Sequence, residues 1–418
     1  MRSTASHLKT VALPTLLGSM GPLAMIVLVA ACASRTYAPT SLSDVDLTTR
    51  AVSQESRGVR VRAAVPSPEE SQAIFGLPVY DRGIQPIWLE ITNHLDERIR
   101  FAPVGTDREY YSPYEVAYMH KSKYAGEAYE AMERAVAGSA MPRVIWPGQT
   151  RSGFVFTHAE PGTKAFNVDV FTLGTELPTF SFFLEVPGFE PDHAAIDFQT
   201  LYDEADIARV DLDGLRTALG EIGCCTTDAE GQAAGLPLNL ALVGPGRDVL
   251  NALLRADFVE RGRAERGVDA ETELYWQGRP ADAVFRTSRR GGRERNELRV
   301  WRAPIEVDGE PVWMAQITNY LGRPTQLGRA LFDPRLDPNL DDATVYTLQR
   351  MWYAQSLSAY AWQQAGSAST IDAPIEDFRG VAYFTGGARI VLWLSGDPIS
   401  QTETIEHEWD DAPYRVQP

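Results

Sequence analysis

The sequence predicts an α+β protein in which an N-terminal antiparallel β-sandwich with a helical insertion precedes an α+β domain with a mostly antiparallel sheet. Apolar and polar residues alternate over residues 59–63 and 86–93, which is the pattern of half-buried strands. The period changes to that of amphipathic helices over residues 112–140. From residue 237 onward, a strand and a helix are followed by several strands, a long helix and closing strands, which favours an α+β arrangement.

The first 31 residues are predicted to be a signal peptide that is cleaved before Cys32. Arg2 and Lys9 provide a basic start, and residues 11–31 carry no charge. The small pair Ala30-Ala31 precedes the cysteine, so the segment resembles the signal of bacterial lipoproteins, in which this thiol is acylated. A single transmembrane helix is the alternative, because the uncharged stretch is about as long as a bilayer requires.

We therefore predict an acyl anchor (palmitate) on Cys32 and a periplasm-facing protein. Ala33, rather than an aspartate, follows the cysteine, which resembles the pattern of lipoproteins sent to the outer membrane; an inner-membrane anchor is the alternative. Residues 32–57 are polar and lack periodicity, and we expect a flexible tether there.

The first domain is predicted over residues 58–190. Besides the two alternating runs, its expected strands cover residues 98–101, 150–156, 165–171 and 181–186. The helical insertion over residues 112–140 is predicted to end at Gly138, with Pro142 beyond it. Strands separated by glycine and proline turns are typical of a sandwich. Residues 191–234 are predicted to be a linker with a short helix near Asp211 and Asp213.

The second domain is predicted over residues 235–400, and an acidic tail over 401–418. Asp308-Gly309 between two alternating runs is a strong hairpin signal. One long helix is expected over residues 341–364, and a closing hairpin around Gly386-Gly387. The remaining expected elements are a strand at 237–244, a helix at 247–257, and strands at 272–277, 282–287, 297–306 and 311–319.

Composition limits the partners of the chain. The formal net charge is −17, and such an acidic chain is a poor candidate for binding nucleic acid, which attracts basic surfaces. Hydrophobic residues make up 44% of the sequence and charged residues 23%, as expected for a folded protein. We predict no nucleic-acid partner, a membrane contact through the acyl anchor, and an envelope protein as a further candidate partner.

Cys224 and Cys225 are adjacent, and three states are open for them: two thiols, a disulfide between neighbours, or a reactive or metal-binding pair. The histidines and cysteines lack the spacing of zinc sites, so no metal and no cofactor are expected.

A basic run interrupts the acidic second half and is a candidate anion site. Arginine grips phosphate or carboxylate with two donors, and the pair Gly291-Gly292 would let backbone N–H groups approach an anion. The alternative is a solvated loop between strands, or a loop that pairs with acidic residues of the same chain. The candidate anion-binding residues are Arg286, Arg289, Arg290, Arg293 and Arg295.

Four segments occur in an order that resembles the LssY C-terminal domain family, over about residues 235–365. They are the segments at residues 237–244, 293–295, 298–302 and 307–313. This family has no established reaction. Some relatives join the domain to membrane phosphatase domains of the lipid-phosphatase type, which implies a link to envelope lipids; this chain does not repeat the phosphatase motifs. Family members often have histidine where Asn296-Glu297 and Arg335-Leu336 stand here.

These features favour a non-enzymatic binding or scaffold protein of the bacterial envelope, linked to export or lipid handling, with no catalytic residue assigned. A carrier or enzyme that holds a phosphorylated lipid through the arginine run is the alternative. A third hypothesis, a solute-binding receptor, requires a cleft between the two domains.

Overall fold

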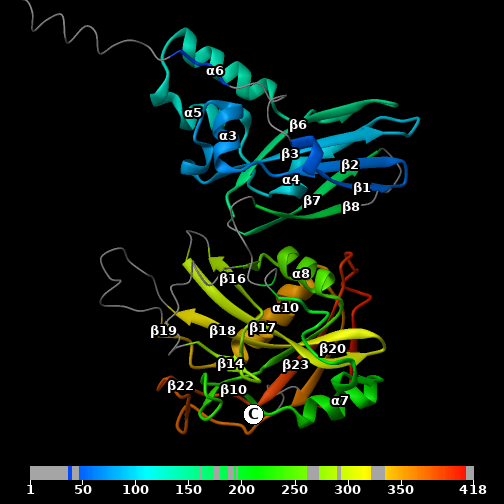
Figure 1. Ribbon diagram of the computed structural model, residues 1–418, viewed down its shortest axis with the longest axis vertical. Coiled ribbons are helices and arrows are strands. Elements are labelled where there is room, and N and C mark those ends of the chain that lie inside the picture. The colour runs from blue at the N-terminus through cyan, green and yellow to red at the C-terminus, as the bar shows by residue number, and fades with distance from the viewer. Residues whose placement is uncertain are drawn as a thin grey trace, which may run out of the picture.

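The computed structural model describes residues 36–39, 47–160, 162–172, 179–186, 193, 196–260, 273–289, 293–321 and 335–410. It has two lobes (Figure 1), one formed by the chain up to residue 186 and the other by the chain from residue 196. Both contain helices and mostly antiparallel sheets, so the predicted α+β class is confirmed.

The first domain contains two four-stranded antiparallel sheets that face each other. One has the order β1 (Val52–Ser56), β2 (Val59–Ala64), β3 (Ile84–Asn93), β6 (Thr150–His158). The other has the order β5 (Val144–Ile145), β4 (Ile99–Ala102), β7 (Thr163–Phe171), β8 (Thr179–Glu185). Alternate residues such as Val61, Leu89 and Phe182 fill the space between the sheets. The period-two pattern of the sequence therefore gives the sandwich core.

Helices cover the outer face of the first sheet, so β3 is buried on both sides. Trp88 of β3 and Phe156 of β6 pack there in one cluster with Met132 and Val136. The helices are α2 (Leu47–Arg50), α3 (Pro68–Phe75), α5 (Pro113–Met119) and α6 (Glu127–Gly138), and α4 (Pro103–Thr106) follows β4. Helices α5 and α6 form the predicted insertion, whereas α3 was not expected.

The first domain begins earlier along the chain than the sequence indicates. Residues 52–56, placed in the expected tether, form β1 and pair with β2. Leu47 is buried in the cluster beneath the helices, and the Tyr37 hydroxyl donates to the carbonyl of Phe75 at 2.9 Å. Backbone pairing and burial of single side chains fix a polar segment that has no periodicity of its own.

A large mixed sheet forms the centre of the second domain (Figure 1). Its order is β13 (Val259–Glu260), β16 (Ala283–Arg289), β17 (Arg293–Val307), β18 (Glu310–Leu321), β12 (Leu240–Val243), β23 (Ala388–Leu394), β20 (Leu357–Gln364), β24 (Ile405–His407). Two short strands join it, β9 (Ala208–Val210) beside β17 and β19 (Arg335–Leu336) beside β18. The predicted hairpin turn lies between β17 and β18, where Val307 pairs with Glu310.

Helices cover both faces of this sheet. Helices α8 (Gly246–Arg255) and α10 (Leu340–Tyr353) pack on one face, and α7 (Leu212–Glu221) packs on the other. A small sheet lies beside the large one, with the order β11 (Ala234–Pro237), β10 (Cys225–Thr227), β14 (Tyr275–Trp276), β15 (Arg279–Pro280). A two-stranded ribbon joins β21 (Ile375–Glu376) to β22 (Ala382–Tyr383).

Residues 191–234 contribute to the second domain rather than forming only a linker. They supply β9, α7 and β10, and Leu215 and Leu219 of α7 lie in a core cluster with Trp301. The expected helix is present, and the side chain of Asp211 caps it by accepting the N–H of Gly214 at 2.8 Å.

Two expected elements of the second domain were wrong. The long helix ends at Tyr353, and the chain turns through Gln355, at φ 56°, into strand β20. The apolar residues that the sequence placed in the last part of this helix belong to strand β20 instead. The expected closing hairpin is also absent from the described residues, because β22 pairs with β21 while β23 runs between β12 and β20.

Among the residues described, no helix is both long enough and apolar enough to cross a bilayer.

Candidate functional site

A cavity of about 360 Å³ lies at the junction of the two domains. This volume is at the lower end of the range of small-molecule sites, roughly 300–1,000 Å³. The wall is mainly apolar and takes residues from both domains. These include Phe183 of β8, Phe198 of the connecting segment, and Val249, Leu250, Phe285 and Trp313 of the second domain.

The amphipathic helix α8 forms one side of the cavity. Val249 and Leu253 are buried against the sheet, and Leu250 lies partly exposed beside the cavity. In Figure 1 this helix lies at the edge of the second domain that faces the first. An apolar stripe that packs on the sheet therefore also presents apolar surface to the space between the domains.

Trp313 of β18 is also part of the cavity wall, and its ring is fixed. Its indole N–H donates to the carbonyl of Gly244 at 3.0 Å, and its ring meets Phe198 edge to face at 5.3 Å between centroids. A Cβ at Gly246 would lie only 3.2 Å from the indole, so a glycine permits this close approach. The turn through Gly244 and Gly246 after β12 thus leaves room for an aromatic side chain against the cavity.

The acidic groups at and behind the wall already have basic partners. Asp282 is buried, receives the guanidinium of Arg279 at 2.6 Å and accepts the backbone N–H of Arg302 at 2.6 Å. His193 Nδ1 lies 2.9 Å from the carboxylate of Glu260, which is 1% exposed. Neither carboxylate faces the cavity as a lone charge.

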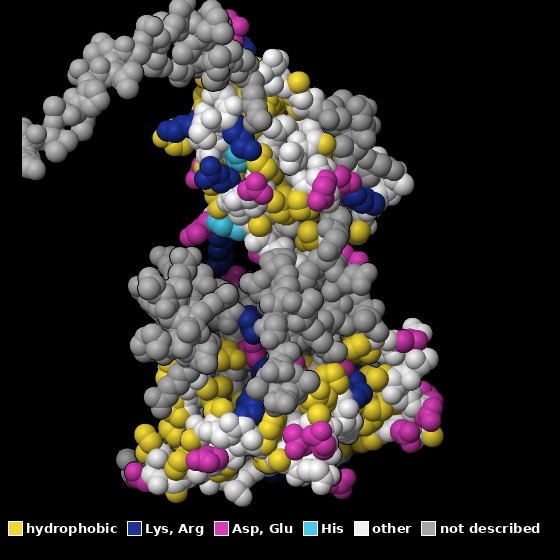
Figure 2. All heavy atoms as spheres, turned by 60° about the vertical axis from the view of Figure 1, so that its left-hand side comes forward, with side chains coloured by type: hydrophobic (Ala, Val, Ile, Leu, Met, Phe, Trp, Pro, Cys, Tyr) yellow, Lys and Arg dark blue, Asp and Glu magenta, His cyan; other side chains and the backbone are white. Residues whose placement is uncertain are grey.

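Arg247 is the remaining charged side chain of the wall. It lies in the first turn of α8, is exposed, and forms no ion pair with any residue in the described part of the chain. The helix starts after Pro245 without a side-chain cap. Figure 2 shows dark-blue basic side chains and a cyan histidine at the waist between the lobes.

The arginine run predicted as an anion site is partly engaged within the protein. Arg286 lies on β16 opposite Glu297 of β17, and its Nη2 lies 2.5 Å from that carboxylate. For Arg286 this agrees with the alternative that the run pairs with acidic residues of the same chain. Arg289, Arg293 and Arg295 lie in β16 and β17, but their side chains, like the whole of Arg290, are outside the described residues.

Glu297 is the centre of a buried charge network. It also receives Nη2 of Arg299 at 2.5 Å and the hydroxyl of Tyr320 at 3.2 Å. Burial is the largest single influence and alone would lower the pKa of Arg299, but Glu297, Tyr320 and Glu273 together outweigh it and the pKa is raised. Burial likewise raises the pKa of Tyr320. Glu273 completes the network at 3.4 Å from Arg299, so the arginines are balanced by two acids.

The segments at Asn296-Glu297 and Arg335-Leu336 lie next to the same strand. Asn296 of β17 pairs with Asn319 of β18, and Leu336 of β19 pairs with Tyr320 on the other side. The Asn296 amide donates to Asn319 and accepts from the Thr287 hydroxyl at 2.8 Å. This chain therefore fills the position with a satisfied amide network.

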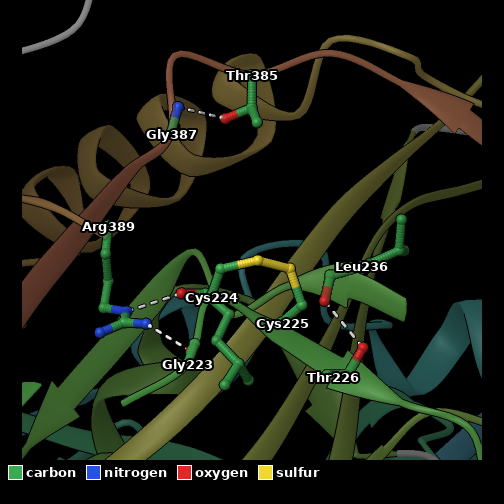
Figure 3. Close-up of a disulfide and its surroundings, with 9 residues drawn as sticks. Gly223, Cys224, Cys225, Thr226, Leu236, Thr385, Gly387 and Arg389 are labelled. Carbon is green, nitrogen blue, oxygen red and sulfur yellow. Dashed lines mark hydrogen bonds between the residues drawn. A yellow bond between two sulfur atoms is a disulfide. The ribbon is translucent and has the colours of Figure 1, made fainter. Parts of the chain in front are cut away.

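Cys224 and Cys225 form a disulfide, one of the three states left open by the sequence. Arg389 of β23 points toward the backbone beside it (Figure 3), donating to the carbonyls of Leu238 and Leu219 at 2.8 Å each and of Gly223 at 3.5 Å. Arg389 is fully buried, and burial lowers its pKa to about 10, so the side chain stays protonated at neutral pH.

Two further predictions concern anchoring and metals. Cys32 lies outside the described residues. In the described ranges, no group of three or more His, Cys, Asp or Glu side chains is arranged to hold a metal ion.

Asp341 receives the hydroxyl of Thr385 and the N–H of Gly386, both at 2.7 Å, and so holds the turn before β23.

The comparisons with known proteins concern the second domain. No curated protein matches the chain. The family match covers residues 272–388, so it begins after and ends beyond the segment indicated by the sequence motifs. It includes β14 to β22, and with them the Glu297 network, Trp313 and Asp282. These residues match the family described as the LssY C-terminus, which confirms the predicted resemblance over this part of the chain.

Proposed function

We propose that this protein is a lipid-anchored binding protein of a Gram-negative envelope that holds an apolar small molecule between its two domains. The cavity at the domain junction is the observation that carries the proposal, because both domains and the connecting segment contribute to its wall. This geometry favours the solute-binding hypothesis, which requires a space between the halves.

Binding fits the cavity better than acid–base catalysis does. Asp282 and Glu260 both hold basic partners at hydrogen-bond distance. The apolar rings of Phe285 and Trp313 supply surface for burial, which stabilises a bound apolar group by about 25 cal/mol per Å² removed from water. A scaffold role for the same surface is the alternative.

The signal-like N-terminus supports the proposed location. Acylation at Cys32 would hold the domains at a membrane surface despite the net charge of −17, which repels anionic lipid. A binding site facing the periplasm could then exchange an apolar molecule with the envelope.

The test uses the full chain in nonionic detergent and a nitroxide-labelled medium-chain fatty acid methyl ester. We expect electron paramagnetic resonance to resolve a motionally restricted component, because a probe in the cavity tumbles with the protein and a probe in a micelle does not. Leu250→Trp fills the cavity and should remove this component.

Leu321→Trp is the matched control, because Leu321 is 39% exposed and does not line the cavity. It should leave the restricted component unchanged. A wild-type protein that shows no restricted component, or a Leu250→Trp protein that keeps it in full, would contradict the proposal.

A further inference from the structure

The charge distribution around the cavity indicates which kind of apolar molecule it holds. Two carboxylates lie at or behind the wall, and each is matched by a base: Asp282 by Arg279, and Glu260 by His193. Arg247 adds a positive charge that no acid in the described residues neutralises. Arg247 is therefore the charged side chain of the described wall that a ligand can meet without displacing an acid, in a protein that is acidic overall.

The acidic residue next to Arg247 does not cancel this charge at the cavity. Asp248 is absent from the cavity wall, and its carboxylate lies against Gly396, where a Cβ would come within 2.4 Å of it. It also contributes to the electrostatic environment of Arg255 at the far end of α8. Arg247 thus borders the apolar space while Asp248 faces the loop after β23.

Gly246 borders the same space as Arg247. The first residues of a helix have backbone N–H groups without intrahelical partners. In α8 the N–H groups of Asp248 and Val249 donate to the carbonyl of Pro245, and no side-chain cap covers those of Gly246 and Arg247. An anionic group placed beside Arg247 would meet these donors as well. The apolar walls alone would not distinguish an anionic group from a neutral one. The guanidinium of Arg247 would therefore determine which end of the ligand lies beside it.

We infer that the cavity binds an amphiphile with an apolar body and an anionic head, either a carboxylate or a phosphate monoester. The body lies among Phe183, Leu250 and Trp313, and the head lies against Arg247. This inference rests on the proposed function and adds the chemical class of the ligand.

The experiment compares two probes on the same full chain, the nitroxide-labelled fatty acid and its neutral methyl ester. We expect the free acid to bind about twofold to fivefold more tightly than the ester, as one exposed charge pair provides. Arg247→Gln should abolish this preference, because it lowers the affinity for the acid more than the affinity for the ester. Arg82→Gln removes an exposed arginine of the first domain and should keep the preference.

Competition then separates the two head groups. Dodecanoate and dodecyl phosphate share a chain length, and the one that displaces the labelled acid at lower concentration identifies the head. Dodecyltrimethylammonium has the same chain and the opposite charge, and it should displace poorly.

The outcomes distinguish this inference from the proposed function. Equal binding of acid and ester by the wild-type chain, or a preference that survives Arg247→Gln, would overturn the inference while the cavity remains a binding site. Displacement by the cationic amphiphile as effective as by the anions would also overturn it. If neither probe binds, the proposed function fails.

Discussion

Arg389 shows how one buried cation can be held without a carboxylate partner in the described chain. Its guanidinium donates to three backbone carbonyls from the segments around the disulfide. Two of these carbonyls belong to the buried residues Leu219 and Leu238, and a buried carbonyl without a partner costs about 1–3 kcal/mol. Arg389 is therefore a positioning residue for the turn that carries Cys224 and Cys225.

Arg389→Lys should destabilise the protein by about 2 kcal/mol or more. A lysine keeps the charge but has one nitrogen, which cannot serve carbonyls that lie on different sides of a planar guanidinium. Urea denaturation checks this, with the exposed Arg151→Lys as the matched control. Equal unfolding midpoints for the two variants would contradict the proposed role.

The cysteine pair gives a second prediction at this scale. Cys224 and Cys225 are bonded to each other, so alkylation of the unfolded, unreduced chain should modify neither residue. Alkylation after treatment with a dithiol should modify both. Peptide mass spectrometry distinguishes these states, and modification of either residue before reduction would show that thiols are present in the native protein.

Asp107 makes the stability of the first domain depend on pH. Burial raises its pKa. The backbone N–H groups of His158 and Glu109 and the ring of His158, whose Nδ1 lies 2.9 Å away, lower the pKa by more, so the net shift is downward. The unfolded chain therefore takes up a proton first as the pH falls below about 4. The stabilisation is present above that pH and is lost as the pH falls through the folded pKa.

Asp107→Asn should remove this part of the pH dependence, because the amide does not titrate. At neutral pH it should lower the free energy of unfolding by about 1–2 kcal/mol, through weaker hydrogen bonds to His158 and Glu109. Unfolding curves between pH 3 and pH 7 provide the measurement. A variant whose stability falls with acid as steeply as that of the wild type would contradict this prediction.

Single elements were predictable where their signals are local. Asp308-Gly309 gives the β17–β18 hairpin, because its residues adopt φ 51° and 85°, which asparagine, aspartate and glycine tolerate. Asp211 is likewise a local signal, because its side chain caps the start of α7. The prediction that the helix continues to residue 364 was wrong. Leu357 and Ala361 are buried by pairing with a neighbouring strand, which the periodicity of the sequence does not reveal.

Gly309→Ala tests the hairpin turn. Alanine disfavours φ 85°, so we expect the free energy of unfolding to fall by about 1 kcal/mol. Gly138→Ala is the control, because this glycine ends helix α6 with open space around it and should be neutral or stabilising. Equal effects of the two substitutions in urea denaturation would contradict the assignment of the turn.

At the scale of the whole molecule, the candidate site could be predicted only in part. A space between the halves was named as the requirement for a receptor, but its wall joins Phe183, Phe198 and Trp313, which lie far apart in the sequence. No motif marks such residues before the fold brings them together. The arginine run was conspicuous in the sequence, yet Arg286 is engaged by Glu297. The charge at the cavity that no described acid pairs with belongs to Arg247.

The proposed anchor gives a prediction for the whole chain. Mass spectrometry of the protein from the membrane fraction should show a polypeptide that begins at Cys32 and carries acyl chains. Cys32→Ser should remain unprocessed, because the proposed acylation of this thiol would have to come before cleavage. Cys224→Ser is the matched control and should be processed normally. A full-length, unmodified wild-type protein would contradict the lipoprotein assignment.

Native mass spectrometry of the full chain extracted from its own membrane tests the proposed binding function most directly. The wild-type protein should retain a small amphiphile that adds a defined mass to the polypeptide, and Leu250→Trp should lack it while remaining folded. If both proteins have the mass of the polypeptide and its anchor alone, or if both carry the same added molecule, the space between the domains does not bind a ligand.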